Sequence, residues 1–104
     1  MKIVAVTSCP VGMAHTYMSA AALKKACKKL GYDVRVETQG SMGIRDKLSQ
    51  EEIDLADIFI DIADVAMMEE ERFKNIHTFS TSTSKVIKNA ELVLEAALNT
   101  LDKK

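Results

Sequence analysis

Cys9 is the residue of this sequence with the clearest capacity for chemistry, because of where its neighbours place it. The apolar run Ile3-Val4-Ala5-Val6 precedes it, and a helix-forming run begins near Ala14 or His15. The first backbone N–H groups of a helix and the positive end of its dipole favour anions. The same field favours a thiolate over a thiol, so the sequence predicts that Cys9 is a nucleophile.

The turn after Cys9 has the composition of an anion-binding loop. Gly12 permits a tight turn and a close approach of the backbone to a ligand, and Thr16 adds a hydroxyl at the start of the helix. The alternative is a small buried cysteine in an ordinary turn that contains Pro and Gly. We favour the anion loop, and we expect a phosphate to be surrounded by Pro10, Val11, Gly12, Met13, Ala14, His15 and Thr16.

Length and composition indicate one globular domain over residues 1–104. Hydrophobic residues make up 47% of the chain, and 14 Lys and Arg oppose 15 Asp and Glu. This balance gives no reason to propose a nucleic-acid partner. The sequence has no apolar run long enough to span a bilayer and no secretory signal, so we expect a soluble, cytosolic protein.

Two cysteines, Cys9 and Cys27, are too few for a disulfide framework. The sequence has no Cys-x-x-Cys motif and no His/Cys cluster at metal-binding spacing, so we predict no metal and no cofactor. Cys27 falls on the apolar side of a predicted helix, where we expect it to pack in the core.

Strand and helix patterns alternate along the chain, which predicts parallel strands joined by helical crossovers. We expect a three-layer, Rossmann-like α/β domain with a four-stranded parallel sheet in the order 2-1-3-4. That order puts the chain reversal, where ligands collect, at the carboxyl end of the first strand. The expected strands are residues 2–6, 33–38, 57–62 and 76–80, and the expected helices are residues 15–30, 50–55, 67–72 and 90–101.

Local signals support several of these boundaries. Gly31 is placed to end the first long helix, Ser49 and Glu52 form a capping box, and Asn89 can cap the last helix. The apolar stripe of the first helix is expected to contain Met18, Ala22, Ala26 and Leu30, with Leu23 and Cys27 beside it.

Polar residues near the other strands give weaker signals. Arg35 and Glu37 alternate with valines, which predicts a wetter face or an edge strand. Asp61 and Asp64 lie at the end of the third expected strand, where a carboxylate would repel a phosphate. We therefore expect both to be solvated.

A loop with two glycines follows the second expected strand, and we expect it to lie beside the Cys9 loop and to face a partner. The alternative is a plain connection. The residues concerned are Gln39, Gly40, Ser41, Met42 and Gly43.

The spacing around Cys9 resembles the phosphate loop of cysteine-dependent tyrosine phosphatases, in which five residues separate Cys from Arg-Ser/Thr. Here His15 stands at the arginine position and Thr16 follows it. The bidentate grip of an arginine on the phosphoryl oxygens is therefore lost. A site that accepts a phosphoryl group and passes it on fits this loop better than one that hydrolyses it.

The segment from Cys9 to Thr16 closely resembles the Cys-Pro-Thr-Gly-Ile-Ala-His-Thr signature of fructose-type IIB components. These belong to the bacterial phosphoenolpyruvate-dependent sugar phosphotransferase system. The resemblance extends to residues 37–43 and 70–73 and covers essentially the whole chain. Val11 and Met13 replace the Thr and Ile of the signature, and Met67-Met68 stands where many members carry acidic residues.

The resemblance implies a phosphoryl relay. A IIA protein or domain carries phosphate on a histidine, Cys9 takes it as a thiophosphate, and a membrane-embedded IIC component holds the sugar, fructose or a related hexose. It also implies a cytoplasmic domain, monomeric in isolation, that docks at the inner face of the membrane. His15 either hydrogen-bonds the phosphoryl group, orients the loop or is simply exposed. We do not expect His77 to carry phosphate.

Two other classes of function stay open. One is a low-molecular-weight phosphatase or arsenate-reductase-like enzyme, which would turn over a small aryl phosphate. The other is a regulatory module that senses phosphorylation by a partner without passing phosphate to a sugar.

Overall fold

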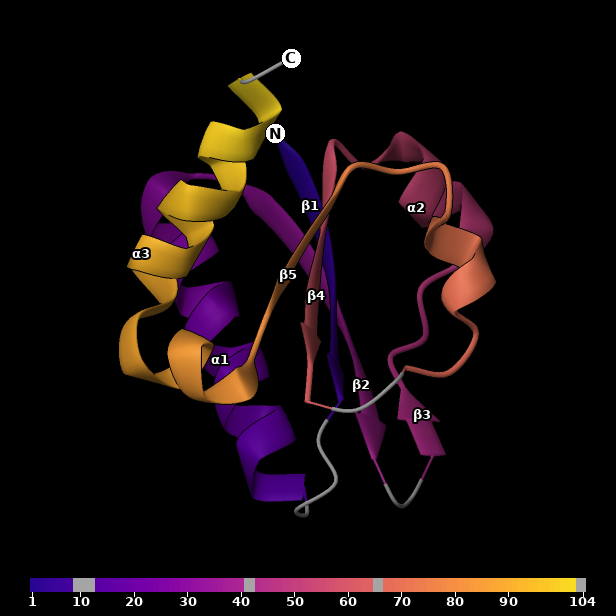
Figure 1. The fold of residues 1–104 in the computed structure, drawn as a ribbon, viewed down its shortest axis with the longest axis horizontal. Coiled ribbons are helices and arrows are strands. Elements are labelled where there is room, and N and C mark those ends of the chain that lie inside the picture. The colour runs from indigo at the N-terminus through magenta and orange to yellow at the C-terminus, as the bar shows by residue number, and fades with distance from the viewer. Residues whose placement is uncertain (9–12, 41–42, 65–66, 103–104) are drawn as a thin grey trace.

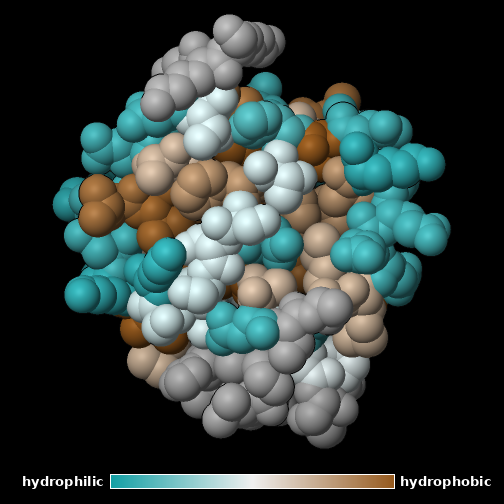
Figure 2. All heavy atoms as spheres, in the orientation of Figure 1, coloured by the Kyte–Doolittle hydropathy of each residue, from teal (hydrophilic) through white to brown (hydrophobic). Residues whose placement is uncertain are grey.

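The computed structural model describes residues 1–8, 13–40, 43–64 and 67–102, and the side chains of residues 13–15 and 102 lie outside that description. Helices α1 (Met13–Leu30) and α3 (Thr83–Asp102) cover one face of a sheet, and α2 (Gln50–Leu55) and the 3-10 helix η1 (Glu70–Phe73) cover the other (Figure 1). Figure 2 shows hydrophilic side chains over the outer sides of both layers. Within the described ranges, no helix is long and apolar enough to cross a membrane.

The described strands form a five-stranded sheet in the order β3-β2-β1-β4-β5. The four expected strands are parallel and lie in the expected relative order. The four-stranded prediction is nevertheless wrong, because a short strand, β3, pairs antiparallel with β2. The strands are β1 (Lys2–Ser8), β2 (Asp33–Gly40), β3 (Gly43–Arg45), β4 (Ile58–Ala63) and β5 (Thr78–Thr81).

The additional strand arises from the glycines of the predicted loop. Gly40 pairs with Gly43, so the chain reverses within a tight hairpin, and Gly43 has a φ of +100°, which favours glycine. Strand β2 consequently lies between β1 and β3 rather than at an edge.

The layer of α1 and α3 is held by apolar packing. Ile3 and Ala5 of β1 contribute to its core, and Leu23 and Cys27 of α1 are fully buried there, as expected. The predicted stripe is wrong at its two ends, because Met18 is 52% exposed and Leu30 is 49% exposed. The buried face is rotated toward Ser19, Ala20, Leu23, Ala26 and Cys27.

Both long helices end or bend at the residues that the sequence indicated. Gly31 has a φ of +79°, and the Tyr32 amide donates to the Cys27 carbonyl at 2.9 Å, which closes the end of α1. Asn89 is non-helical (φ −159°, ψ 85°), and its side chain accepts from the Leu92 amide at 3.1 Å, which confirms it as a cap. The preceding helical residues, from Thr83 on, were not predicted.

The opposite layer combines a smaller apolar core with polar contacts. Phe59 of β4 stacks on Phe73 of η1 with ring centroids 3.8 Å apart. The predicted capping box of α2 is confirmed by reciprocal hydrogen bonds between Ser49 and Glu52. The prediction of a wet face or an edge strand at Glu37 is wrong, because Glu37 is 0% exposed.

Candidate functional site

The carboxyl end of β1 is where the chain leaves the sheet toward Cys9. Ser8 is in register with Gln39 of β2 and Ala63 of β4, and its carbonyl accepts the Asp64 amide at 2.8 Å. Cys9, Pro10, Val11 and Gly12 lie outside the described residues, and α1 begins directly after them. The elements on both sides of Cys9 therefore have the strand-to-helix order that was predicted.

The N-terminal turn of α1 carries no acidic residue. The positive end of this 18-residue helix is therefore not neutralised by a carboxylate of its own first turn. Thr16 is 3% exposed, and among the described residues its hydroxyl oxygen has no hydrogen-bond partner. Its carbonyl accepts the Ser19 hydroxyl at 3.0 Å. A buried hydroxyl without a partner is costly, and an anion oxygen bound at this helix end would satisfy it.

The glycine-containing loop is only partly as predicted. Gly40 and Gly43 are half-buried at the end of the β2–β3 hairpin, and Ser41 and Met42 lie outside the described residues. We expected Gln39 to face a partner, but its side chain is buried, with 1% of the residue exposed.

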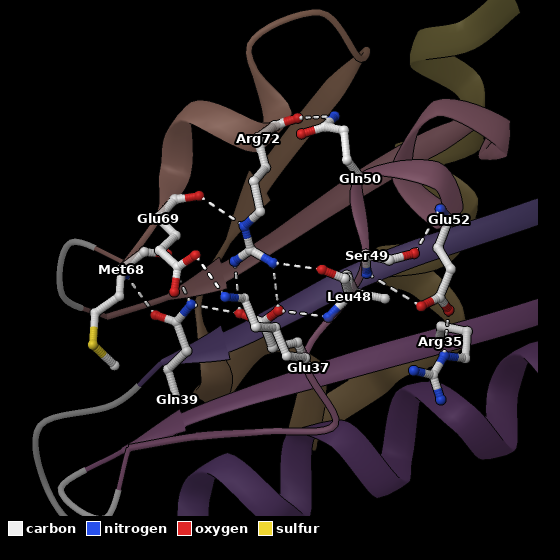
Figure 3. Close-up of polar contacts among 11 residues, drawn as sticks. Arg35, Glu37, Gln39, Leu48, Ser49, Gln50, Glu52, Met68, Glu69 and Arg72 are labelled. Atoms are coloured by element: carbon white, nitrogen blue, oxygen red, sulfur yellow. Dashed lines mark hydrogen bonds and ion pairs between the residues drawn. The ribbon is translucent and has the colours of Figure 1, made fainter.

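Gln39 instead bonds to the chain that follows β4 (Figure 3). Its side-chain nitrogen donates to the Met68 carbonyl at 3.0 Å, and its side-chain oxygen accepts from the Met68 amide at 2.6 Å. The same nitrogen donates to Oε2 of Glu37 at 2.7 Å. One side chain thus replaces the two backbone bonds that a neighbouring strand would make to Met68.

Glu37 and Arg72 form a buried ion pair behind Gln39. The two terminal guanidinium nitrogens of Arg72 donate to the two carboxylate oxygens of Glu37 at 2.8 and 2.9 Å. Arg72 also donates to the carbonyls of Leu48 (2.9 Å) and Glu69 (3.0 Å), and the Leu48 amide donates to Glu37 at 2.8 Å. Each nitrogen of the guanidinium is bonded to a protein oxygen, so we do not assign Arg72 to phosphate.

This environment sets the ionisation of Glu37. Burial alone would raise the pKa of its carboxyl group, but hydrogen bonds from Arg72, Gln39 and the Leu48 amide, with the Arg72 charge, hold the pKa below its usual value. The carboxylate is therefore the stable form, and the pair remains ionised at neutral pH.

The surroundings of Cys27 and His77 differ from each other. Burial raises the pKa of the Cys27 thiol to about 11, so Cys27 is a core residue and not an activated nucleophile. His77 is exposed and bonds to the Thr100 hydroxyl at 2.7 Å. In the described parts of the chain, no group of three or more His, Cys, Asp and Glu side chains is arranged to hold a metal ion.

Of the two aspartates expected to be solvated, Asp64 is exposed but also hydrogen-bonded, and Asp61 is half-buried. Asp64 accepts hydrogen bonds from the Thr83 amide (3.2 Å) and hydroxyl (2.6 Å), so it holds the start of α3. Asp61 is half-buried, and one of its carboxylate oxygens has no hydrogen-bond partner among the described residues. Burial and the nearby Glu70 charge raise the pKa of Asp61.

Sequence reasoning missed the Glu37–Arg72 pair because alternation with valines made Glu37 look solvent-exposed. A signal was nevertheless present. Glu37 and Arg72 lie in the two segments outside the cysteine loop, residues 37–43 and 70–73, that carried the family resemblance.

Comparisons with known proteins agree on one family. The family model described as "PTS system, Lactose/Cellobiose specific IIB subunit" matches residues 4–96. A fructose-specific EIIB'BC component of Xanthomonas campestris is 46% identical over 93% of this chain, and a fructose-like EIIB component 2 of Escherichia coli is 43% identical over 89% of it.

The two relatives differ in length. The chain covers 88% of the Escherichia coli protein but only 17% of the Xanthomonas protein. Among solved structures, a domain of a fructose-specific IIABC component from Borrelia burgdorferi superposes with a TM-score of 0.89 and 46% identity, covering 94% of this chain and 93% of that domain.

A more distant structure shares only the fold. An arginine phosphatase, YwlE, solved as a variant with a phosphorylated active-site serine, superposes with a TM-score of 0.52 at 15% identity, over 100% of this chain and 97% of that one. The three-layer α/β architecture is therefore common to both proteins, and this likeness says nothing of the reaction.

Proposed function

This chain belongs to the IIB family of the sugar phosphotransferase system, in its fructose type, and we propose that it relays a phosphoryl group through Cys9. The donor is a phosphohistidine on a IIA protein or domain. The acceptor is a sugar, fructose or a related hexose, held by a membrane-embedded IIC component. The domain, residues 1–104, would act in the cytoplasm and dock at the inner face of the membrane.

One observation carries the proposal beyond family membership. The N-terminus of α1 follows the Cys9 loop directly, has no acidic residue in its first turn, and holds the Thr16 hydroxyl buried without a described partner. Such a helix end favours an anion, and the same field lowers the pKa of a cysteine placed before it.

The chemistry assigned to Cys9 is a double displacement at phosphorus. The Cys9 thiolate attacks the phosphorus in line, the S–P bond forms, the P–N bond to the donor imidazole breaks, and the imidazole keeps the electron pair. A sugar hydroxyl then attacks, the P–S bond breaks and the thiolate returns, while the hydroxyl proton leaves to a base or to water.

The surrounding residues would stabilise charge rather than form bonds. We assign the backbone N–H groups of residues 10–15, except that of Pro10, to the phosphoryl oxygens, with the Thr16 hydroxyl as an additional donor. His15 would donate to the same group or orient the loop.

Transfer is favoured over rapid hydrolysis by what surrounds the loop. A phosphatase of the cysteine class would need an arginine on the phosphoryl oxygens and an acid for the leaving group. Arg72 is bonded to Glu37, and Asp64 accepts two hydrogen bonds at the start of α3. Neither residue is therefore a good candidate for those roles.

Phosphoryl transfer to variants tests the proposal. The donor is the IIA region of a fructose-specific EIIABC component, such as that of Bacillus subtilis, charged from phosphoenolpyruvate by the general phosphocarrier proteins. Wild type and Cys27→Ala should be labelled, and Cys9→Ala should not. Alanine is preferred to serine at position 9, because a serine hydroxyl can itself accept a phosphoryl group.

Two results would count against the relay. Label that persists in Cys9→Ala would show that another residue carries the phosphate. Multiple-turnover hydrolysis of p-nitrophenyl phosphate by the wild type, lost in Cys9→Ala, would favour the phosphatase alternative.

A further inference from the structure

Gln39 is a buried side chain whose bonding partners are one other side chain and the backbone of Met68. Its amide group makes both hydrogen bonds that Met68 would make to a strand, at 3.0 and 2.6 Å. No backbone pairing within the described residues holds Met68 in place. The hydrogen bonds that place the Met68 backbone at the carboxyl end of the sheet therefore come from one side chain.

The Glu37–Arg72 pair holds Gln39 and the same segment from behind. Glu37 accepts from the Gln39 amide at 2.7 Å, and Arg72 bonds the Glu69 carbonyl at 3.0 Å. Glu69 has a φ of +56°, a left-handed conformation that costs a residue with a side chain free energy. Lys47, paired with Glu69 at 2.8 Å, adds a further contact. The contacts from Arg72 and Lys47 thus stabilise the unfavourable backbone conformation of Glu69, next to Met68.

The location of this segment connects it to the site. Gln39 is in register with Ser8, the residue before Cys9, and its side chain lies on the face of the sheet that η1 covers. Met68 is 44% exposed, and its side chain extends away from the ion pair (Figure 3). Met68 is therefore an exposed side chain held near the strand end that leads into Cys9.

We propose that Gln39 is a positioning residue, which holds Met68 in the place where the phosphohistidine donor contacts this protein. The inference rests on the proposed relay through Cys9. A buried ion pair seldom adds net stability over an apolar replacement, whereas it can specify one conformation. Here that conformation includes the Met68 segment near the end of β1, so losing Gln39 should weaken donor binding and leave the thiolate chemistry intact.

Three variants separate these effects. Gln39→Leu keeps approximately the volume but removes both bonds to Met68 and the bond to Glu37. Met68→Ala removes the contacting side chain and keeps the backbone bonds. Ser49→Ala is the matched control, because it breaks the cap of α2 in the same layer, at a loss of about 1 kcal/mol, without touching Met68.

The measurement is phosphoryl transfer from the phosphorylated IIA region at varied donor concentration, below the unfolding temperature of each variant. Two lost hydrogen bonds reduce the fraction of molecules with Met68 in place, so Gln39→Leu should raise the KM for the donor about tenfold or more. Met68→Ala should raise this KM in the same direction, and Ser49→Ala should leave it within about twofold of wild type. The rate of Cys9 alkylation by iodoacetamide should change by less than about twofold in all three.

Failure of this inference is distinct from failure of the relay. If wild type is labelled and Gln39→Leu has an unchanged KM, the positioning role is wrong and the relay stands. If Gln39→Leu lowers kcat and slows Cys9 alkylation at constant KM, Gln39 acts on the cysteine loop and the docking assignment is overturned. If wild type is not labelled on Cys9, the proposed function itself fails.

Discussion

The two faces of the sheet are stabilised by different means. On the α1–α3 face, apolar side chains such as Leu23 and Leu94 are fully buried against the strands. On the α2–η1 face, a buried carboxylate and an amide of β2 bond to a guanidinium of η1 and to the backbone of Met68 just before it. Apolar packing rewards buried area and tolerates changes of shape, whereas a buried ion pair fixes one geometry. The ion pair is connected through Gln39 to the carboxyl end of β1, because Glu37 bonds to Gln39 and Gln39 is in register with Ser8.

The largest effect should come from breaking the ion pair on one side only. Arg72→Leu leaves Glu37 buried without its cation, which should cost about 4 kcal/mol in the free energy of unfolding. Urea unfolding of this variant and of the double variant Glu37→Met/Arg72→Leu tests the comparison. The double variant should recover much of the loss, since it buries no uncompensated charge. A double variant that is less stable than Arg72→Leu would contradict the account.

A core deletion in the other layer should be nearly as destabilising but functionally silent. Leu94 of α3 is 0% exposed, so Leu94→Ala should cost about 3 kcal/mol through lost burial and the cavity left behind. Phosphoryl transfer measured at a temperature where the variant is folded should match wild type. A raised KM for the donor would show that the helix layer also shapes the site.

Acid should remove the stability that the Glu37 carboxylate contributes. The pKa of Glu37 is lower in the folded protein than its usual value of 4.5, so its contribution to stability is present above that value and is lost as pH falls through the folded pKa. Urea unfolding from neutral pH to about pH 3 should show that the free energy of unfolding falls more steeply for wild type than for the double variant Glu37→Met/Arg72→Leu. If the free energy of unfolding falls equally with pH in both proteins, carboxyl groups other than Glu37 determine the acid sensitivity.

The smallest effect concerns Asp61, on the same face as the ion pair but without a described partner for one oxygen. Its pKa is raised by burial and by Glu70, so its carboxylate destabilises the fold at neutral pH, and this cost disappears as pH falls through the raised pKa. Asp61→Asn should therefore stabilise the protein by about 0.5 kcal/mol at pH 7, a value reduced for partial exposure. Thermal unfolding at pH 7 measures the gain, and a lower melting temperature would contradict it.

Much of the fold could be predicted because local signals decided it. The unbroken apolar run in β1 indicated a strand covered on both faces, and Gly31 and the Ser49–Glu52 capping box marked helix ends correctly. The β3 strand could not be predicted in the same way, because Gly43 and Ile44 have no strand pattern of their own. Their pairing with β2 depends on the tight reversal between Gly40 and Gly43.

The candidate site was predictable only where chemistry is local. Cys9 could be singled out because a nucleophile, a turn and a helix start adjoin in the sequence. The roles of Gln39 and Glu37 were not visible, because their partners Met68 and Arg72 lie about thirty residues away and are brought to them by the fold. A polar residue that alternates with valines looks exposed unless its buried partner is known.

The central claim is that Cys9 carries the phosphoryl group, and locating the phosphate tests it most directly. The wild-type protein is phosphorylated by the charged IIA region, digested under conditions that preserve S–P and N–P bonds, and mapped by mass spectrometry. The account predicts phosphate on the peptide that contains Cys9 and, by fragmentation, on the cysteine itself. Phosphate on His15, His77 or Cys27 would contradict the account.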